Sequence, residues 1–413
     1  MSVIPASDKA ILRELARQIA QAAALPVMDE RRGLWRRLNA LKPIRPMVII
    51  EQVCWCEMNV NDELTLRCEN PECREYERWM RKTLYHHNYM PDDRVIEPYL
   101  VVHKAITGGT AGIESIEETL STDEANIVLS RHYVNQFTCM EDIEKIKMPI
   151  IRHDTAETER RLAVAHELFD GVIDIRAEGD CPGVSVWDNI AMWMGVENAL
   201  YALSDEPEMM FALVSRMVAF YGSMFDQLEE QGLLCPTHTM VHCSGAWTDE
   251  LPKEGYNPEK PRLKDIWTCG LAQMLGSCSP QMLNEYEIEP CAPLFERFGL
   301  VYYGCCESLD NKLDSVKNIP NLRKISASPW SHQETFAEQI GGGYVMSRKP
   351  NPALVAFESF DGDLIRADLM KTKEICTRYG SPFELILKDL STVRYQPQRL
   401  WKWAEIAMEV VCS

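Results

Sequence analysis

Short apolar runs alternate with amphipathic stretches along most of this chain. The runs lie at residues 46–52, 99–106, 171–179, 237–245, 300–308, 323–329, 342–348 and 383–389. Each run is short and apolar enough for a buried strand. Strands that alternate with helices favour a parallel sheet, and about eight of them favour a closed barrel. The pattern therefore predicts an α/β protein with a (β/α)8 TIM barrel.

The same pattern predicts how the chain is organised around the barrel. Residues 1–45 have apolar positions at helical spacing, which indicates an N-terminal helical extension. Residues 53–98 are too long for a simple connection and predict a helical insertion after the first strand. The clearest amphipathic helix covers residues 207–232. We therefore predict an extension at 1–45 followed by a barrel at 46–413.

Composition narrows the classes of partner. The chain of 413 residues carries 62 acidic and 43 basic residues, a formal net charge of -19. An acidic surface repels phosphate backbones and anionic lipids, so we expect no nucleic acid or membrane partner. The N-terminus lacks the pattern of a signal peptide, and no window offers about 18 uninterrupted apolar residues. With 15 cysteines and no such signal, we expect free thiols and a cytoplasmic location.

The second half of the chain, roughly 200–411, carries an ordered series of strand ends and turns. A helix that closes on Gly299 is followed by an apolar strand and the turn YGCCESLD, then by SPWSHQETFA, YVMSRKPNPALVA and FELILKDLSTVRYQPQRLWKWAEIA. In order and spacing this series resembles the corrinoid-dependent methyltransferase branch of the uroporphyrinogen decarboxylase superfamily. The resemblance implies a barrel that moves a methyl group from a small methylated substrate to the cobalt of a corrinoid protein, its partner. We favour O-demethylation of methoxylated aromatics, because the aromatic-rich insertion suits a flat ring.

Two other functions remain open. Tetrapyrrole decarboxylases of this superfamily carry an arginine-rich segment after the first strand, whereas this chain reads IIEQVCWCEM there. A decarboxylase or lyase on a small carboxylated substrate is the alternative, with Arg176, Lys104 and Arg348 as its cations. The third hypothesis is a barrel-shaped scaffold subunit with an opening packed by Tyr302 and Tyr303. The sequence also leaves a homodimer open.

A tentative zinc site is the predicted centre of the chemistry. Many members of the family that the chain resembles hold zinc with a His-x-Cys pair and a later cysteine. Those positions fall on Gly304-Cys305-Cys306 and near Ser391, so only Cys306 matches. From the residues themselves, Cys305, Cys306 and His332 at strand ends are the predicted metal ligands, since thiolates and imidazoles suit zinc. The alternative is a cysteine pair that fills the core and a structural histidine.

Other strand ends supply the remaining candidates. His242 is predicted to bind substrate or transfer a proton to the leaving oxygen. Glu307 and Asp389 are predicted as catalytic carboxylates. The predicted substrate-binding residues are Glu51, Trp55, Tyr303 and Ser391. The cysteines at 54, 56, 68 and 73 are spaced unlike a zinc ribbon, which favours a packed insertion.

Overall fold

A six-stranded parallel sheet forms the centre of the computed structural model, which describes residues 4–120, 130–235 and 237–413. Its strands, in spatial order, are β1 (Met47–Ile50), β14 (Phe383–Leu387), β13 (Val345–Arg348), β12 (Leu322–Ala327), β11 (Leu300–Tyr303) and β10 (Trp267–Gly270). Every residue of β1, β11, β13 and β14 is buried. Burial on both faces explains why β1 and β11 are continuous apolar runs.

Carboxylates cover the outer edge of β1. The backbone N–H of Val48 donates to Asp93 Oδ2 at 2.8 Å, and that of Ile50 donates to Asp92 Oδ2 at 2.9 Å. The N–H of Asp93 donates in turn to the Val48 carbonyl at 2.8 Å. Buried backbone groups need partners. These two aspartates therefore do for β1 what a neighbouring strand would do.

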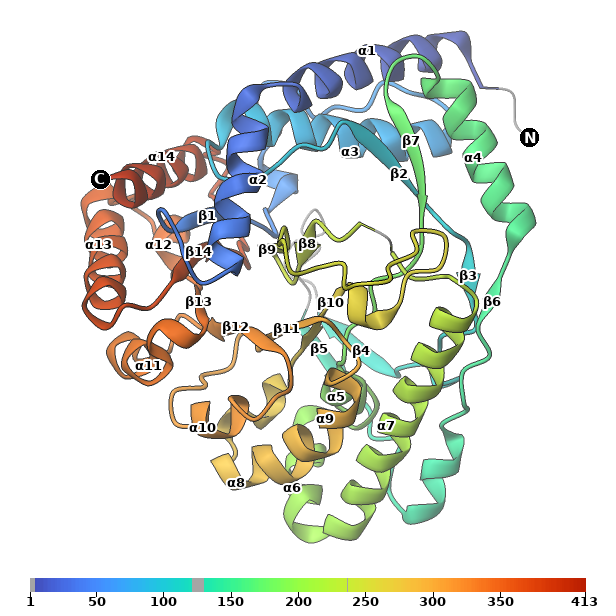
Figure 1. Cartoon of the computed structure of the whole chain (residues 1–413), viewed down its shortest axis with the longest axis vertical. Coiled ribbons are helices and arrows are strands. Elements are labelled where there is room, and N and C mark those ends of the chain that lie inside the picture. Colours follow the sequence, from blue (N-terminus) through green and yellow to red (C-terminus); the bar gives the residue numbers. More distant parts are fainter. Residues whose placement is uncertain (1–3, 121–129, 236) are drawn as a thin grey trace.

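The other parallel strands continue the curved arrangement of the central sheet as a partial ring (Figure 1). β2 (Tyr99–His103) pairs in parallel with β7 (Asp174–Glu178). Parallel bridges from Asp180 to Leu234 and from Val184 to Gly270 lead from β7 towards β10. Within the described residues, no ladder joins β1 to β2. The fold is therefore a barrel-like α/β arrangement, and hydrogen-bonded closure of a full barrel stays a prediction.

Helices surround this ring in Figure 1. They are α1 (Ala6–Ala23), α2 (Pro26–Asn39), α3 (Pro71–Tyr89), α4 (Thr155–Phe169), α5 (Val186–Met194), α6 (Val196–Asp205), α7 (Pro207–Glu230), α8 (Pro280–Leu283), α9 (Glu289–Phe295), α10 (Leu313–Val316), α11 (Gln333–Ile340), α12 (Ala353–Ala356), α13 (Gly362–Tyr379) and α14 (Gln398–Cys412). Short antiparallel pairs join β3 (Ile106–Thr107) to β6 (Arg152–His153) and β4 (Glu117–Leu120) to β5 (Ser130–Tyr133).

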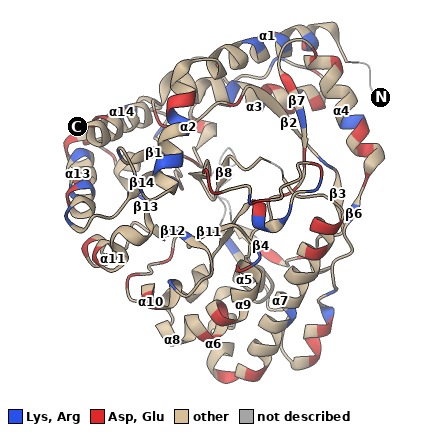
Figure 2. Ribbon diagram, in the orientation of Figure 1, with Lys and Arg blue, Asp and Glu red and all other residues tan. Residues whose placement is uncertain are grey.

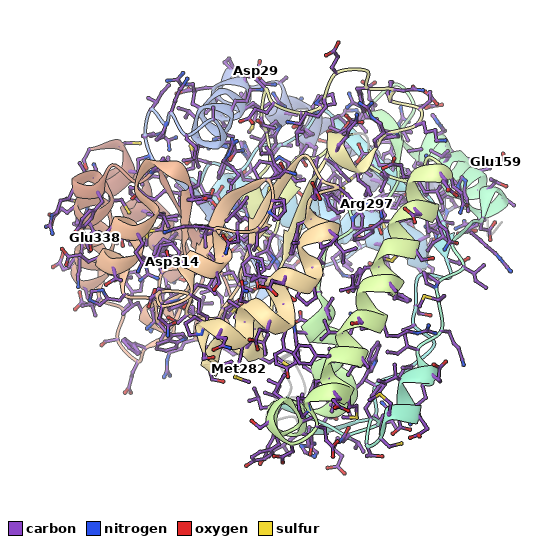
Figure 3. The ribbon with its side chains drawn as sticks, turned by 60° about the horizontal axis from the view of Figure 1, so that its bottom comes forward. Asp29, Glu159, Met282, Arg297, Asp314 and Glu338 are labelled. Carbon is purple, nitrogen blue, oxygen red and sulfur yellow. The ribbon has the colours of Figure 1, made fainter. Side chains whose placement is uncertain are left out.

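Charged side chains of both signs are spread over the outer helices (Figure 2). Some of them link neighbouring helices. Arg297, labelled in Figure 3, follows α9 and donates to Asp226 on α7 at 2.6 Å. Among the described residues, no helix is both long and apolar enough to cross a membrane.

The structure corrects the strand predictions at two places. Residues 237–245 do not form one parallel strand, because His242 and Cys243 adopt positive φ angles of 41° and 66°. These angles turn the chain back into an antiparallel hairpin of β8 (Met240–Val241) and β9 (Ser244–Gly245). The sequence analysis also missed β10, whose short WTCG segment has no β-branched run.

Candidate functional site

Left-handed backbone conformations gather at strand ends around one place in the ring. Gln52 follows β1 with φ 50°, and Asp389 follows β14 with φ 58°. His242 and Cys243 form the turn between β8 and β9, and Gly304 follows β11 with φ 92°. Residues other than glycine adopt such angles at a cost in free energy, and they cluster at functional sites. The carboxyl ends of parallel strands are also where barrel proteins carry their sites.

A chain of close polar contacts joins four side chains at this place. Cys305 Sγ lies 3.5 Å from Cys306 Sγ and 3.1 Å from Lys388 Nζ. Cys306 Sγ lies 3.4 Å from Asp389 Oδ2. We call these four residues the Cys305 cluster. Cys305 and Lys388 are buried, whereas Cys306 is half-buried and Asp389 is exposed, so the cluster is open on one side.

The surroundings of Cys305 favour its thiolate. The hydrogen bond from Cys306 lowers the pKa of Cys305, and His242 and Lys388 lower it further, against the opposing effect of burial. The same bond raises the pKa of Cys306, which keeps its proton. Burial opposes the charge of Lys388, but the thiolate of Cys305 keeps the pKa of that ammonium raised. The site therefore holds one thiolate among cationic and thiol hydrogen-bond donors.

Hydrogen bonds of the Cys305 backbone and a glycine fix the turn that carries Cys305. The backbone N–H of Cys305 donates to Glu307 Oε2 at 2.8 Å, and its carbonyl accepts from Ser326 Oγ at 2.6 Å. A side chain at Gly304 would approach Leu309 to 2.8 Å, so only glycine fits this turn. Glu307 is 6% exposed, and burial raises its pKa. Glu307 therefore positions the turn, and its role as a catalytic carboxylate stays a prediction.

A buried ion pair in the lumen holds the hairpin that carries His242. Lys324 Nζ lies 2.9 Å from Glu384 Oε2, and both residues are fully buried. Ser244 Oγ lies 2.6 Å from Lys324 Nζ and 2.8 Å from Glu384 Oε2. At Gly245 an added Cβ would lie 2.4 Å from the Trp35 ring. The pair thus anchors β9 and, through it, the turn at His242.

Two more ionisable groups near the cluster were missed by the sequence analysis. Lys349 is buried and donates to the hydroxyl of Tyr302 and to Ser347 Oγ, the latter at 3.0 Å. Burial lowers the pKa of Lys349 to about 8. Burial, followed by the charge of Cys305, raises the pKa of Asp188 on α5 to about 6. Lys349 and Asp188 follow predicted strands or the loops after them. No local pattern in the sequence indicated that they belong to a site.

Two of the predicted substrate-binding residues line a pocket beside the cluster. The pocket measures about 200 Å³, and Glu51, Trp55 and Trp79 are among its lining residues. Glu51 is paired with Arg94. The backbone N–H of Glu51 donates to the carbonyl of Leu387 at 2.8 Å, so the pocket adjoins the chain next to Lys388 of the cluster.

Three other predicted site residues lie elsewhere. Tyr303 is fully buried and packs against Phe295 at a ring distance of 6.2 Å, so it belongs to the core. His332 is the N-cap of α11, where its Nδ1 accepts a 3.3 Å hydrogen bond from the backbone N–H of Thr335. Ser391 is exposed in the loop after β14. The structure therefore does not bring His332 to Cys305 and Cys306 as a ligand.

The cluster does not fit the predicted zinc ion. Within residues 4–120, 130–235 and 237–413, no three His, Cys, Asp or Glu side chains are placed to hold a metal. The cation that faces the thiolate of Cys305 is the ammonium of Lys388. A divalent ion at this thiolate would be repelled by that ammonium. We therefore assign no step to zinc.

Comparisons with known proteins support the fold and do not show the chemistry of the site. No known protein family matches the chain, and no curated protein matches its sequence. Of 21 chains of solved structure that match, one is a methyltransferase from Methanosarcina mazei. It is 11% identical, the match covers 92% of this chain and 98% of that chain, and the TM-score is 0.50. Similarity at this level shows a shared fold.

Proposed function

We propose that this chain is a methyltransferase that moves a methyl group from a small methylated compound to the cobalt of a corrinoid carried by a partner protein. The observation that carries the proposal is the 3.1 Å contact of Cys305 Sγ with Lys388 Nζ at one end of the strands, where Cys306, His242 and Lys388 lower the pKa of Cys305. The fold shared with a methyltransferase over nearly the whole of both chains supports it.

The favoured reaction is O-demethylation of a methoxylated aromatic. In it the bond between methyl carbon and ether oxygen breaks, the methyl group passes to cobalt, and the electron pair of the bond stays on the oxygen. The corrinoid of the partner supplies the nucleophilic metal. The chain must then stabilise an aryloxide and give it a proton.

The cluster provides the groups that an aryloxide requires. Lys388 keeps its ammonium because its pKa is raised, so it stabilises the negative oxygen by charge. His242, one of the groups that lower the pKa of Cys305, is the proposed proton donor. Cys305 is thus an anion beside the ammonium of Lys388. Trp55 and Trp79 in the adjoining pocket offer apolar faces for the ring of the substrate.

The alternative as a decarboxylase or lyase has less support. It requires Arg176, Lys104 and Arg348 to meet at one carboxylate. Instead, Arg176 lies 3.6 Å from the Tyr99 ring centroid, and Lys104 Nζ donates to the Gly232 carbonyl at 2.9 Å. Arg348 is buried and donates to the Ser328 carbonyl at 3.1 Å. Each cation is already bound at a different place.

The test is methyl transfer by the purified chain. A reduced corrinoid protein and a panel of aryl methyl ethers are added, and formation of methyl–cobalt is followed by absorbance together with release of the phenol. We expect transfer, and we expect Lys388→Met to slow it by about 100-fold, the effect of removing one donor to a developing oxyanion. Lys402→Met is the matched control, because Lys402 pairs with Glu405 on the exposed side of α14. Absence of transfer from every aryl ether and methylammonium donor would refute the proposal.

A further inference from the structure

A second pair of cysteines lies where β7 leads towards β10. Asp180 and Leu234 form a parallel bridge, and the Cys235 N–H donates to the Asp180 carbonyl at 2.8 Å. One residue further along each segment are Cys181 and Cys235. Neighbouring strands lie about 4.8 Å apart, within the Cα separation that a disulfide spans. The two thiols lie close enough for each to shift the pKa of the other.

The two cysteines differ in exposure and in partners. Cys235 is buried, and its thiol lies 2.8 Å from the Thr237 carbonyl and 3.3 Å from Glu178 Oε2. The single S–H proton of Cys235 thus has acceptors within reach, and the neighbouring Cys181, followed by burial, raises the pKa of this thiol, so Cys235 keeps its proton. Cys181 is exposed. Its hydrogen bond with Cys235, aided by His238, lowers the pKa of Cys181 against the effect of burial.

The ring of His238 is held in one orientation towards this pair. The backbone N–H of Trp267 donates to His238 Nδ1 at 3.2 Å. With Nδ1 as an acceptor, the neutral ring carries its proton on Nε2. The Nε2 proton of His238 is available to the thiolate of Cys181. After Cys235, His238 is the second neighbour that favours the charged form of Cys181.

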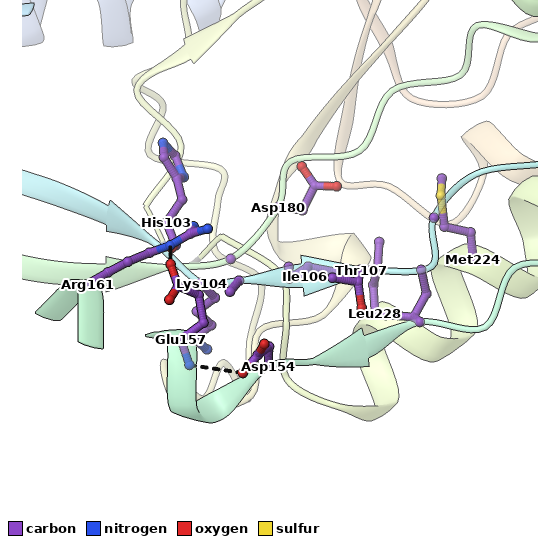
Figure 4. A pocket seen from close by; sticks show the side chains of 14 residues that line it. His103, Lys104, Ile106, Thr107, Asp154, Glu157, Arg161, Asp180, Met224 and Leu228 are labelled. Atoms are coloured by element: carbon purple, nitrogen blue, oxygen red, sulfur yellow. Dashed lines mark hydrogen bonds and ion pairs between the residues drawn. The ribbon is translucent and has the colours of Figure 1, made fainter. Parts of the chain in front are cut away.

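Open pockets lie near this pair. A pocket of about 470 Å³ is lined by His103, Gly179 and Asp180, and Figure 4 shows His103 and Asp180 on its wall. A second pocket, of about 440 Å³, is lined by His103, Glu178 and Thr237. Cys181 follows Asp180 in the chain and is itself exposed, so an oxidant can approach its thiol.

We propose that Cys181 and Cys235 are a reversible oxidation site that reacts with peroxides. The Cys181 thiolate attacks one oxygen of the peroxide, the O–O bond breaks, the other oxygen leaves as hydroxide or alkoxide, and Cys181 becomes a sulfenic acid. The Cys235 sulfur then attacks the sulfur of Cys181, a disulfide forms, and one water leaves. An added thiol reductant restores both cysteines. This site is separate from the Cys305 cluster and does not depend on the proposed methyl transfer.

The experiment treats the full chain with hydrogen peroxide and maps disulfides by peptide mass spectrometry. We expect a disulfide between Cys181 and Cys235 that dithiothreitol reverses. In Cys235→Ser we expect a sulfenic acid at Cys181 that dimedone traps, because the second thiol is missing. Since the reaction needs a thiolate, Cys181 should also react with iodoacetamide at pH 7 at least about tenfold faster than an unactivated exposed cysteine.

The matched control is Cys139→Ser. Cys139 is exposed, but its hydrogen bond with Glu141 raises the pKa of its thiol. The variant should form the 181–235 disulfide as the original chain does, and circular dichroism checks the fold of each variant. Persistence of the main disulfide in Cys181→Ser would overturn the proposal, as would equal alkylation rates at Cys139 and Cys181.

Discussion

The Cys305–Cys306 pair and the Cys181–Cys235 pair each combine a thiol of lowered pKa with a thiol of raised pKa. Each also has a histidine from the segment around β8 beside it, His242 in the first case and His238 in the second. The charged neighbours differ. Lys388 Nζ lies 3.1 Å from Cys305 Sγ, whereas a carboxylate oxygen of Glu178 lies 3.3 Å from Cys235 Sγ.

This difference explains why two cysteine pairs with the same pattern of pKa shifts have different proposed functions. A fixed ammonium holds the thiolate of Cys305 as one half of an ion pair, and that ammonium is a cationic donor for a leaving oxygen. At Cys181 the lowered pKa depends on a neighbouring thiol and a histidine, and the side chain is exposed, which suits attack on an oxidant. The neighbouring charge, rather than the cysteine spacing, separates the two sites.

The largest expected effect comes from Lys324→Met, which removes the anchor of the His242 hairpin. Glu384 would remain fully buried without its cation, so the free energy of unfolding should fall by about 3–5 kcal/mol. Urea denaturation measures this loss. Alkylation of Cys305 should slow, while alkylation of Cys181 should not change, because His238 is held by Trp267 instead.

Two variants sharpen that result. Lys402→Met removes one partner of the exposed pair with Glu405 and should leave the urea midpoint unchanged. The double variant Lys324→Met with Glu384→Leu should recover most of the lost stability, because no buried charge remains. Equal slowing at Cys305 and Cys181 would show that the two sites share one support, contrary to the comparison.

A smaller effect is expected from Asp188→Asn, as a dependence of stability on pH. Burial, then the charge of Cys305, raises the pKa of Asp188 to about 6, against about 4 in an unfolded chain. Between these values the folded chain binds more protons, so this group lowers stability as pH rises from about 4 to 6. As the pH rises from about 4.5 to 7, the free energy of unfolding of the variant should therefore increase by about 1–2 kcal/mol relative to that of the original chain. Urea denaturation measures this difference.

Cys305→Ser separates the two causes at Asp188. Removing the thiolate should reduce the pH dependence without abolishing it, because burial remains the larger cause. Cys181→Ser is the matched control, since the charge of Cys181 is not among the causes of this shift. A change in the Asp188 slope in Cys181→Ser would mean that the two sites are electrostatically linked.

The sequence predicted most of the strands because burial on both faces produces long apolar runs. It predicted Cys305, Cys306, His242 and Asp389 as strand-end residues, and the structure brings these four to one place. It could not predict Lys388 as the partner of Cys305, because 82 residues separate the two positions in the chain. Pairing between distant strand ends depends on the order of strands in the sheet, which no local pattern encodes.

The wrong prediction for His332 has a local cause. The segment SHQETF carries an N-cap pattern, a polar residue followed by a helical stretch, and Thr335 lies three positions later. A ligand and a cap are both polar residues that follow a strand, so position alone does not separate them. The N-cap reading also explains why His332 lies apart from the thiols.

His332→Ala is expected to have the smallest effect, and only on stability. Loss of the cap should cost about 1 kcal/mol in urea denaturation, because the Thr335 N–H loses its acceptor. His332→Asn should restore most of that loss, since asparagine is a good N-cap. Alkylation of Cys305 and methyl transfer should stay within about twofold in both variants, as expected for a surface change away from the site. A large loss of Cys305 reactivity in both, with the fold intact, would place His332 in the cluster. It would also remove the distinction between a thiolate held by an ammonium, at Cys305, and one that depends on a thiol and a histidine, at Cys181.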